Sequence, residues 1–279
     1  MTYKTLLVHC DADRRAAVRL ELAAEMAAQW SAHLVGLHAR QPVRLPGYVL
    51  AELGEDLIAQ HRRASERQAE SVRQAFDQVV RRAGLTGSEW RSYEGDLLDV
   101  LTLSARYADL AILGQHDPDD DGSTIPSYFA ELAAVQAGRP VMVVPYAGRF
   151  DKRIRRVVIA WNASRESTRA VTDAMPFLRN AEKVTVLVIN PKQGAGGHGE
   201  VPGADLALWL ARHGVKAEAT VDPGVTIDIG SYLLSRSADL QADLIVMGAY
   251  GHARMREIVF GGVTRTIMTE MTVPVLLSH

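Results

Sequence analysis

The chain has 279 residues, 31 Lys and Arg against 33 Asp and Glu, a formal net charge of −2 and a single cysteine. This near-neutral charge gives no support to a protein that coats nucleic acid, because such proteins carry a strong basic excess. One cysteine cannot form an internal disulfide, and no apolar run approaches the roughly 20 residues needed to span a bilayer. The apolar start of the chain is too short for a signal peptide, so we expect a cytoplasmic protein that binds neither nucleic acid nor a membrane.

The chain contains two related halves. In the first half the run ADLAILG ends at Gly114, and in the second half the run ADLIVMG ends at Gly248; a proline follows 26 positions after each glycine. The starts of the halves, residues 4–11 and 155–162, also match. Self-similarity of this kind predicts a duplication with divergence.

We therefore expect two domains, residues 1–147 and residues 152–279, joined by a short polar segment. The second half has 16 basic and 13 acidic residues from position 148, a balance of +3, which leaves −5 for the first half. This distribution permits an anionic ligand in the second half.

The first half opens with a short apolar strand that carries His9 and Cys10. We interpret these two as a core histidine and an inert thiol rather than a catalytic pair. Asp11, which follows the strand, is expected to cap the next helix together with Asp13. The extra length of this half lies in a helical stretch, Ala51–Ala83, for which we expect one-sided packing; contact with a partner or a second chain is the functional alternative.

Strands and helices alternate along the second half. The expected strands are Arg156–Trp161, Lys183–Asn190, Val215–Val221, Asp243–Met247 and Val273–Leu277, and the expected helices are Ser164–Leu178, Gly203–His213, Ile229–Leu240 and Val263–Met271. Most of the strands are apolar throughout rather than alternating, which is typical of strands covered on both faces. The pattern predicts two tandem doubly wound α/β domains, each with a mostly parallel sheet and helices on both faces.

Glycines follow the fourth strand of the second half at an unusual spacing: Gly248, Gly251 and then the pair Gly261 and Gly262, which opens a helix. Glycine allows left-handed backbone angles and a close approach of phosphate. Free N–H groups at a helix start attract anions, and Thr264 adds a hydroxyl. Each glycine alone could merely end a strand or begin a helix, but together they predict a phosphate-binding loop.

The run MGAYGHARMREIVFGG resembles the G-x2-G-x9-G-[S/T] signature of the universal stress protein family, and the whole chain looks like a tandem member. The resemblance implies a sheet order of 3-2-1-4-5 in each half and pairing through the fifth strands, either between the halves or in a homodimer. It also implies a stress-response role and an adenine nucleotide, ATP, ADP or AMP, with or without Mg²⁺. The positions that match the nucleotide-binding residues of the family are Asn162, Val188, Met247, Gly248, Gly251, Gly261, Gly262 and Val263, and the contact near Val188 is expected through the main chain.

Two residues depart from the family pattern. Gly262 stands where the family usually has Ser or Thr, so a side-chain hydrogen bond of about 0.5–1.5 kcal/mol is lost while the main-chain donors remain. Asn162 replaces an Asp, and its amide can accept a hydrogen bond without the gain that charge provides. An alternative role for Asn162, together with Ser164, is to cap the helix from Arg165. The two roles are compatible.

The first half retains only Gly114 of this loop. Acidic residues follow it, and their charges would repel a triphosphate, so we expect an acidic, solvated loop and no nucleotide in this half. A calcium site is the less favoured alternative, because Pro118 interrupts the loop and no downstream Glu completes it. The acidic residues of the loop are Asp117, Asp119, Asp120 and Asp121, and the calcium alternative would use Asp117, Asp119 and Asp121.

The sequence thus favours a regulatory protein that binds an adenine nucleotide in its second half. No catalytic constellation and no metal site stand out. Two alternatives stay open: a nucleotide-free scaffold for unknown protein partners, and a slow ATP-hydrolysing or nucleotidyl-transferring enzyme.

Overall fold

The computed structural model describes residues 2–40, 47–120, 125–148, 153–191, 201–249 and 262–279, without the side chains of 47–58 and 61. The strands are β1 Thr5–His9, β2 His33–Arg40, β3 Ser88–Glu94, β4 Leu110–Gly114, β5 Val141–Val144, β6 Arg156–Ala160, β7 Lys183–Ile189, β8 Ala217–Asp222, β9 Leu244–Gly248 and β10 Val275–Ser278. The helices are α1 Ala16–Trp30, α2 Gly47–Arg82, α3 Leu97–Ala105, α4 Phe129–Gln136, α5 Arg165–Asp173, α6 Met175–Leu178, α7 Ala204–Arg212, α8 Ile229–Asp239 and α9 Gly262–Glu270. Within these residues no helix combines the length and the apolar character needed to cross a membrane.

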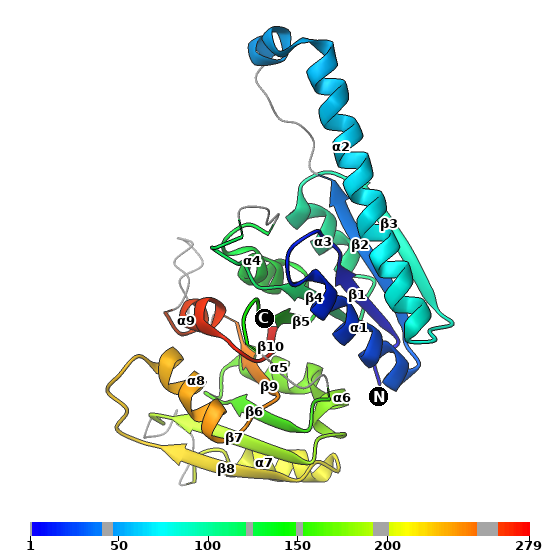
Figure 1. Ribbon diagram of the computed structural model, residues 1–279. Coiled ribbons are helices and arrows are strands. Elements are labelled where there is room, and N and C mark those ends of the chain that lie inside the picture. The colour runs from blue at the N-terminus through cyan, green and yellow to red at the C-terminus, as the bar shows by residue number, and fades with distance from the viewer. Residues whose placement is uncertain (1, 41–46, 121–124, 149–152, 192–200, 250–261) are drawn as a thin grey trace.

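All of these strands form one sheet in the order β3-β2-β1-β4-β5-β10-β9-β6-β7-β8. Within each half the order is 3-2-1-4-5 and the pairing is parallel, which confirms the predicted α/β fold. The halves join where β5 and β10 pair antiparallel, with Val143 opposite Val275 and Val141 opposite Leu277 (Figure 1). The fifth strands therefore pair within the chain, and this leaves neither of their edges free for a second molecule.

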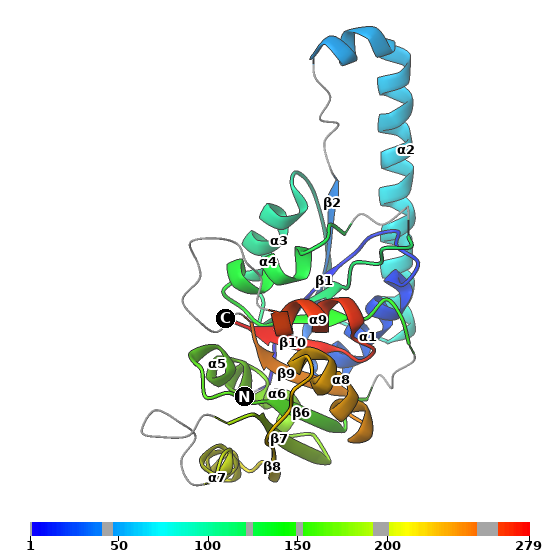
Figure 2. The ribbon, with the colours of Figure 1, turned by 90° about the vertical axis from the view of Figure 1, so that its left-hand side faces the viewer.

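Helices cover both faces of the sheet (Figure 2). One face packs against α1, α2, α5, α6 and α7, and the other face packs against α3, α4, α8 and α9. Both apolar layers run through the two halves without a break, because each layer contains buried residues from the strands on either side of the junction. The two halves therefore share one continuous core.

Aromatic side chains fasten the junction on one face. Tyr3 and Trp30 of the first half lie edge-on to each other and to Phe177 of α6, with ring centroids 4.9–5.6 Å apart. The Tyr3 hydroxyl also donates a hydrogen bond to the carbonyl of Asp173. Edge-to-face pairs of this kind contribute about 0.5–1.5 kcal/mol each beyond their buried area.

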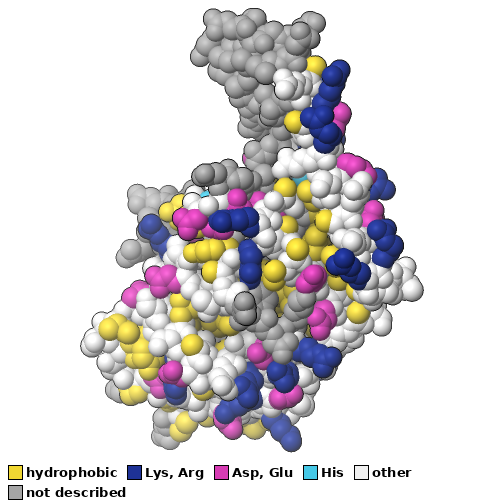
Figure 3. Space-filling model, in the orientation of Figure 1, with side chains coloured by type: hydrophobic (Ala, Val, Ile, Leu, Met, Phe, Trp, Pro, Cys, Tyr) yellow, Lys and Arg dark blue, Asp and Glu magenta, His cyan; other side chains and the backbone are white. Residues whose placement is uncertain are grey.

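Helix α2 extends far beyond the rest of the molecule (Figures 1 and 2). Among its described side chains Val72, Phe76 and Val80 are buried, which confirms one-sided packing near its C-terminal end. Gly36 of β2 makes room for this contact, since a Cβ atom there would lie 2.7 Å from the Phe76 ring. On the face in Figure 3, basic side chains lie among acidic ones and form no single patch.

The helix expected at Ser164–Leu178 is broken in two. It ends at Asp173, and α6 begins at Met175 with Pro176 in its first turn. Proline has no N–H to donate to the carbonyl four residues earlier, so an unbroken helix is disfavoured here.

Candidate functional site

A cavity of about 230 Å³ opens at the carboxyl ends of β6, β7 and β9, beside α8 and the start of α9. This is the edge of a doubly wound sheet at which ligands bind. Six residues predicted from the sequence line it: Asn162, Met247, Gly248, Gly262, Val263 and Thr264. Gly251 and Gly261 lie outside the described residues.

The other walls of the cavity are apolar. They are formed by Ala160, Trp161, Leu187, Ile189, Ile229 and Leu233. Sequence reasoning missed these residues, although the four-residue spacing of the last two on α8 is a recognisable signal for one helix face. An apolar wall of this kind suits a flat ring system rather than a free ion.

Val188 does not line the cavity. Successive side chains of a strand point to opposite faces, so Leu187 and Ile189 face the cavity while Val188 is fully buried in the core on the other side. The neighbours of Val188 therefore supply the side chains at this wall, and the main-chain contact expected near Val188 stays a prediction.

The end of β6 leads directly into a capped helix. The Asn162 side-chain oxygen accepts a hydrogen bond from the Ser164 N–H at 3.1 Å. The Ser164 hydroxyl in turn accepts from the Ser167 N–H at 3.1 Å, which confirms Ser164 as the N-cap of α5. Asn162 is exposed at the mouth of the cavity, so its amide group retains capacity for a further hydrogen bond.

Gly248 is required by packing. A Cβ atom at this position would lie 2.5 Å from the Ser167 nitrogen and 2.6 Å from the Glu166 carbonyl carbon, both backbone atoms of α5. These distances are too short for any side chain. Gly248 is thus explained by the close approach of α5 to β9, whatever the cavity holds.

The start of α9 supplies hydrogen-bond donors at the opposite wall. The first N–H groups of a helix have no acceptor within the helix and lie at the positive end of its dipole. Thr264 is 4% exposed and lines the cavity. Gly262 is exposed, and a Cβ atom there would meet nothing within 4 Å.

The equivalent place in the first half is filled by side chains. Phe129 stands at the position of Val263 and His9 at that of Ala160, with their rings 5.9 Å apart. Ile125 lies against Gly114, since a Cβ atom on that glycine would be 2.8 Å from the isoleucine δ-carbon. The cavity that remains beside Gly114 measures only about 10 Å³.

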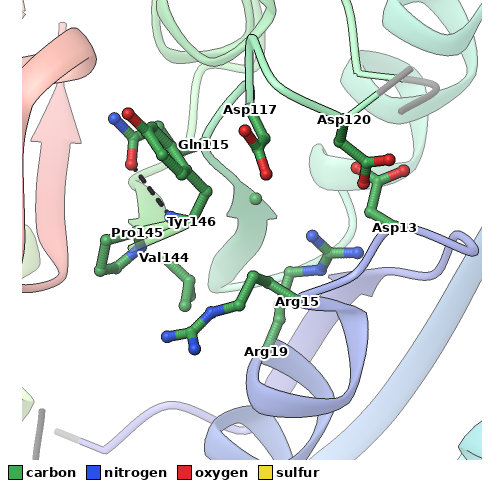
Figure 4. A pocket seen from close by; sticks show the side chains of 10 residues that line it. Asp13, Arg15, Arg19, Gln115, Asp117, Asp120, Val144, Pro145 and Tyr146 are labelled. Carbon is green, nitrogen blue, oxygen red and sulfur yellow. Dashed lines mark hydrogen bonds between the residues drawn. The ribbon is translucent and has the colours of Figure 1, made fainter. Parts of the chain in front are cut away.

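A buried ion pair lies beside this filled site. Arg19 Nη2 is 2.6 Å from Asp11 Oδ1, and His9 Nδ1 is 3.1 Å from Asp11 Oδ2. The Arg19 Nε–H also donates to the carbonyl of His9 at 2.8 Å. Burial by itself raises the pKa of Asp11, but Arg19 and then His9 overcome this effect and hold it well below its usual range. Figure 4 shows Arg15 and Arg19 projecting from α1 into this region.

Asp11 is therefore not the cap of α1. Arg15 occupies the N-cap position, and its side chain makes no capping hydrogen bond. The expected core environment of Cys10 is correct, because the thiol is fully buried and burial raises its pKa. His9 is also a core residue as expected, since it is 2% exposed, and its ring in addition lies against the Asp11 carboxylate.

The acidic loop is less solvated than we expected. Asp117 lies 3.0 Å from Arg14 Nη2, and Asp120 lies 3.7 Å from Arg14 Nε; both carboxylate side chains are only 12% exposed. Arg14 lies just before the N-cap residue of α1 and partly neutralises the loop. Within the described residues no cluster of three metal-ligating side chains occurs, and Asp121 lies outside them.

The comparisons with known proteins agree with this fold. The model of the universal stress protein family matches residues 153–279. The universal stress protein of Archaeoglobus fulgidus DSM 4304 superposes with a TM-score of 0.73 at 14% identity, over 98% of this chain and 95% of that chain. A functionally unknown protein from Pseudomonas aeruginosa PAO1 superposes with a TM-score of 0.59 at 14% identity, over 99% of this chain and 92% of that chain.

A universal stress protein in complex with cAMP is similar over 52% of this chain and 98% of that chain, with 21% identity and a TM-score of 0.39, a likeness too low to carry its ligand over. No protein of curated function matches the sequence. At these identities the solved structures establish the fold alone, and the family model adds the family. The second half of the chain therefore belongs to the universal stress protein family, and the chain as a whole has the fold of a two-domain member.

Proposed function

We propose that the second half binds one adenine nucleotide, ATP, ADP or AMP, in the cavity between β6, β9 and α9. The observation that carries this proposal is the cavity itself, which lies at the carboxyl ends of the strands and brings the Asn162 amide opposite Thr264 at the start of α9. An amide, a hydroxyl and the free N–H groups of a helix start are groups that ribose and phosphate oxygens can meet.

Each wall of the cavity has a suitable part of the nucleotide to meet. The apolar side chains, such as Leu187 and Ile229, would cover the base, and the Asn162 amide can accept from a ribose hydroxyl. The N–H groups of Gly262 and Val263 and the Thr264 hydroxyl would hold phosphate. Any Mg²⁺ would arrive with the phosphates, since the described residues offer no cluster of three ligands.

The proposed role is regulatory rather than catalytic. The described lining of the cavity contains no Asp, Glu, His, Lys or Arg that could act as a general base or neutralise a leaving group. We further propose that residues 1–147 are a degenerate domain with a structural or regulatory task and that residues 152–279 form the nucleotide-binding domain. A stress-linked function in the cytoplasm follows from the family as an expectation.

A nucleotide-free interaction scaffold is the second candidate. It is favoured by Gly262, which lacks the hydroxyl usual in the family, and by Asn162, which lacks the carboxylate. In that case the glycine loop persists for folding, as the packing of Gly248 against α5 illustrates.

Nucleotide binding is tested first by heating the protein with each nucleotide. A ligand at 100 times its dissociation constant adds about 2.7 kcal/mol to the free energy of unfolding, which shifts the melting temperature measurably. Nucleotide retained through purification is measured in parallel by chromatography of the denatured protein. If millimolar ATP, ADP and AMP leave the melting temperature unchanged and no nucleotide is retained, the scaffold is the correct function.

A matched pair of variants locates the site. Thr264→Val removes the hydroxyl and keeps the shape, and we expect affinity to fall about tenfold or more, since a hydrogen bond to a charged group contributes about 1.5–3 kcal/mol. Thr269→Val is the control, because the exposed Thr269 hydroxyl bonds only to carbonyls of its own helix at 3.0 Å. Equal affinities of the two variants would contradict the assignment of the cavity.

A further inference from the structure

The helix that lines the candidate site rests on the opposite half of the chain. Ile267 and Met268 of α9 are buried in the same apolar layer as Ala133 and Ala134 of α4. Arg265 lies over the ring of Tyr128, with its guanidinium carbon 6.0 Å from the ring centroid. The first half thus forms the support against which α9 is held.

One buried side chain makes a direct polar link across this junction. Gln115 follows β4 in the first half and is 4% exposed. Its Nε2 donates a hydrogen bond to the carbonyl of Met268 at 2.7 Å, and its Oε1 accepts from the Tyr146 N–H at 3.0 Å (Figure 4 shows the second bond). The amide is therefore fixed by the first half and directed at α9.

The hydrogen bond from Gln115 reaches α9 at its C-terminal end, where backbone carbonyls lack partners within the helix. The helix ends at Glu270, so the carbonyl of Met268 belongs to the last turn and has no helical N–H four residues further on. Gln115 supplies the missing donor. The corresponding position in the second half is Ala249, which has no side-chain donor. Only the first half thus provides such a side-chain cap among these two positions, and the helix that it caps is α9, beside the open cavity.

We propose that Gln115 is a positioning residue for the nucleotide site: it holds α9 from the first half and thereby sets the Gly262–Thr264 donors against the cavity. This inference rests on the proposed function. A helix of nine residues is about 13 Å long and moves as a rigid rod. A restraint on the position of Met268 therefore also restrains the position of Thr264. By linkage, a bound nucleotide in turn favours the docked arrangement of α9.

The test compares Gln115→Met, which keeps the length and loses both hydrogen bonds, with Gln136→Met, the same change at an exposed position of α4. We expect Gln115→Met to speed hydrogen exchange of the α9 amides about three- to tenfold and to weaken ATP binding by a similar factor. This is the effect expected from losing the neutral hydrogen bond that Gln115 donates to α9. Amides of α5 and α7, which pack on the other face of the sheet, should be unchanged.

A second variant serves if Gln115→Met does not fold. Gln115→Glu keeps an acceptor for the Tyr146 N–H, but when ionised it replaces the donor to Met268 by a buried negative charge that repels the carbonyl, so at pH 7 it should show exchange and affinity changes at least as large. A fall in stability with uniform exchange and unaltered affinity would reduce Gln115 to a structural residue and overturn the proposal. If the wild-type protein binds no nucleotide, the proposed function fails by itself, and the exchange of α9 alone decides whether Gln115 positions the helix.

Discussion

Restoring a hydroxyl at Gly262 tests how the start of α9 contacts a ligand. The position is exposed, its φ is not positive, and a Cβ atom would meet nothing within 4 Å, so serine and alanine both fit without strain. Replacing glycine in a helix stabilises the fold by about 0.5–1 kcal/mol. A serine hydroxyl that also donates to phosphate adds about 1.5–3 kcal/mol to binding, which corresponds to roughly tenfold to hundredfold tighter affinity.

Gly262→Ser and Gly262→Ala separate these two effects. Urea denaturation of the free protein should give similar gains in the free energy of unfolding for both variants. Titration calorimetry with ATP should show tighter binding for Gly262→Ser alone, because only serine adds a donor. If the two variants bind ATP equally, or if serine weakens binding, phosphate does not lie at the start of α9 and the reasoning about this helix is refuted.

Three further changes probe the rest of the fold. Asp11→Asn leaves the buried Arg19 charge unpaired and should cost about 3–5 kcal/mol of stability at pH 7 by urea denaturation. Because Arg19 holds the pKa of Asp11 low, the ionised pair contributes fully to stability above the ordinary Asp pKa of about 3.9. The difference in the free energy of unfolding between wild type and variant should therefore narrow as the pH falls below that value. A difference that does not depend on pH would contradict the pairing. Gly248→Ala should lower the midpoint of thermal unfolding even without nucleotide, because its Cβ atom overlaps the backbone of α5; an unchanged midpoint would argue against this packing. Phe177→Ala should cost about 3–5 kcal/mol and alter the fluorescence of Trp30 in the native state, and an unaltered emission would exclude the aromatic contact across the junction.

The sheet was predictable because most of its strands are apolar on both faces and the sequence repeat places them twice. Strand order came from the resemblance to a family. Whether the fifth strands pair within the chain or between molecules could not be predicted, since Val143 and Val275 offer the same edges in either case.

The glycines and Thr264 of the candidate site were predictable, because their residue types and spacing are typical of a phosphate-binding loop. The residues that reach the site only through the three-dimensional packing of strands and helices were harder to predict. A main-chain contact was expected near Val188, and that expectation did not say which side chains of the strand face the cavity. A shift of one position along a strand reverses the face, so the structure was needed to place Leu187 and Ile189 there. Asp11 looked like a helix cap because short polar residues after a strand often are caps. Only the tertiary contact with Arg19, which is buried among apolar residues of α1, gives Asp11 another role.

The number of nucleotides bound per chain tests the central claim most directly. Calorimetric titration of nucleotide-free protein with ATP should give one site per chain, because the second half has an open cavity while Phe129 and Ile125 fill the first. Two sites per chain would contradict the closure of the first half. No binding at millimolar ATP, ADP or AMP would contradict the proposed function itself.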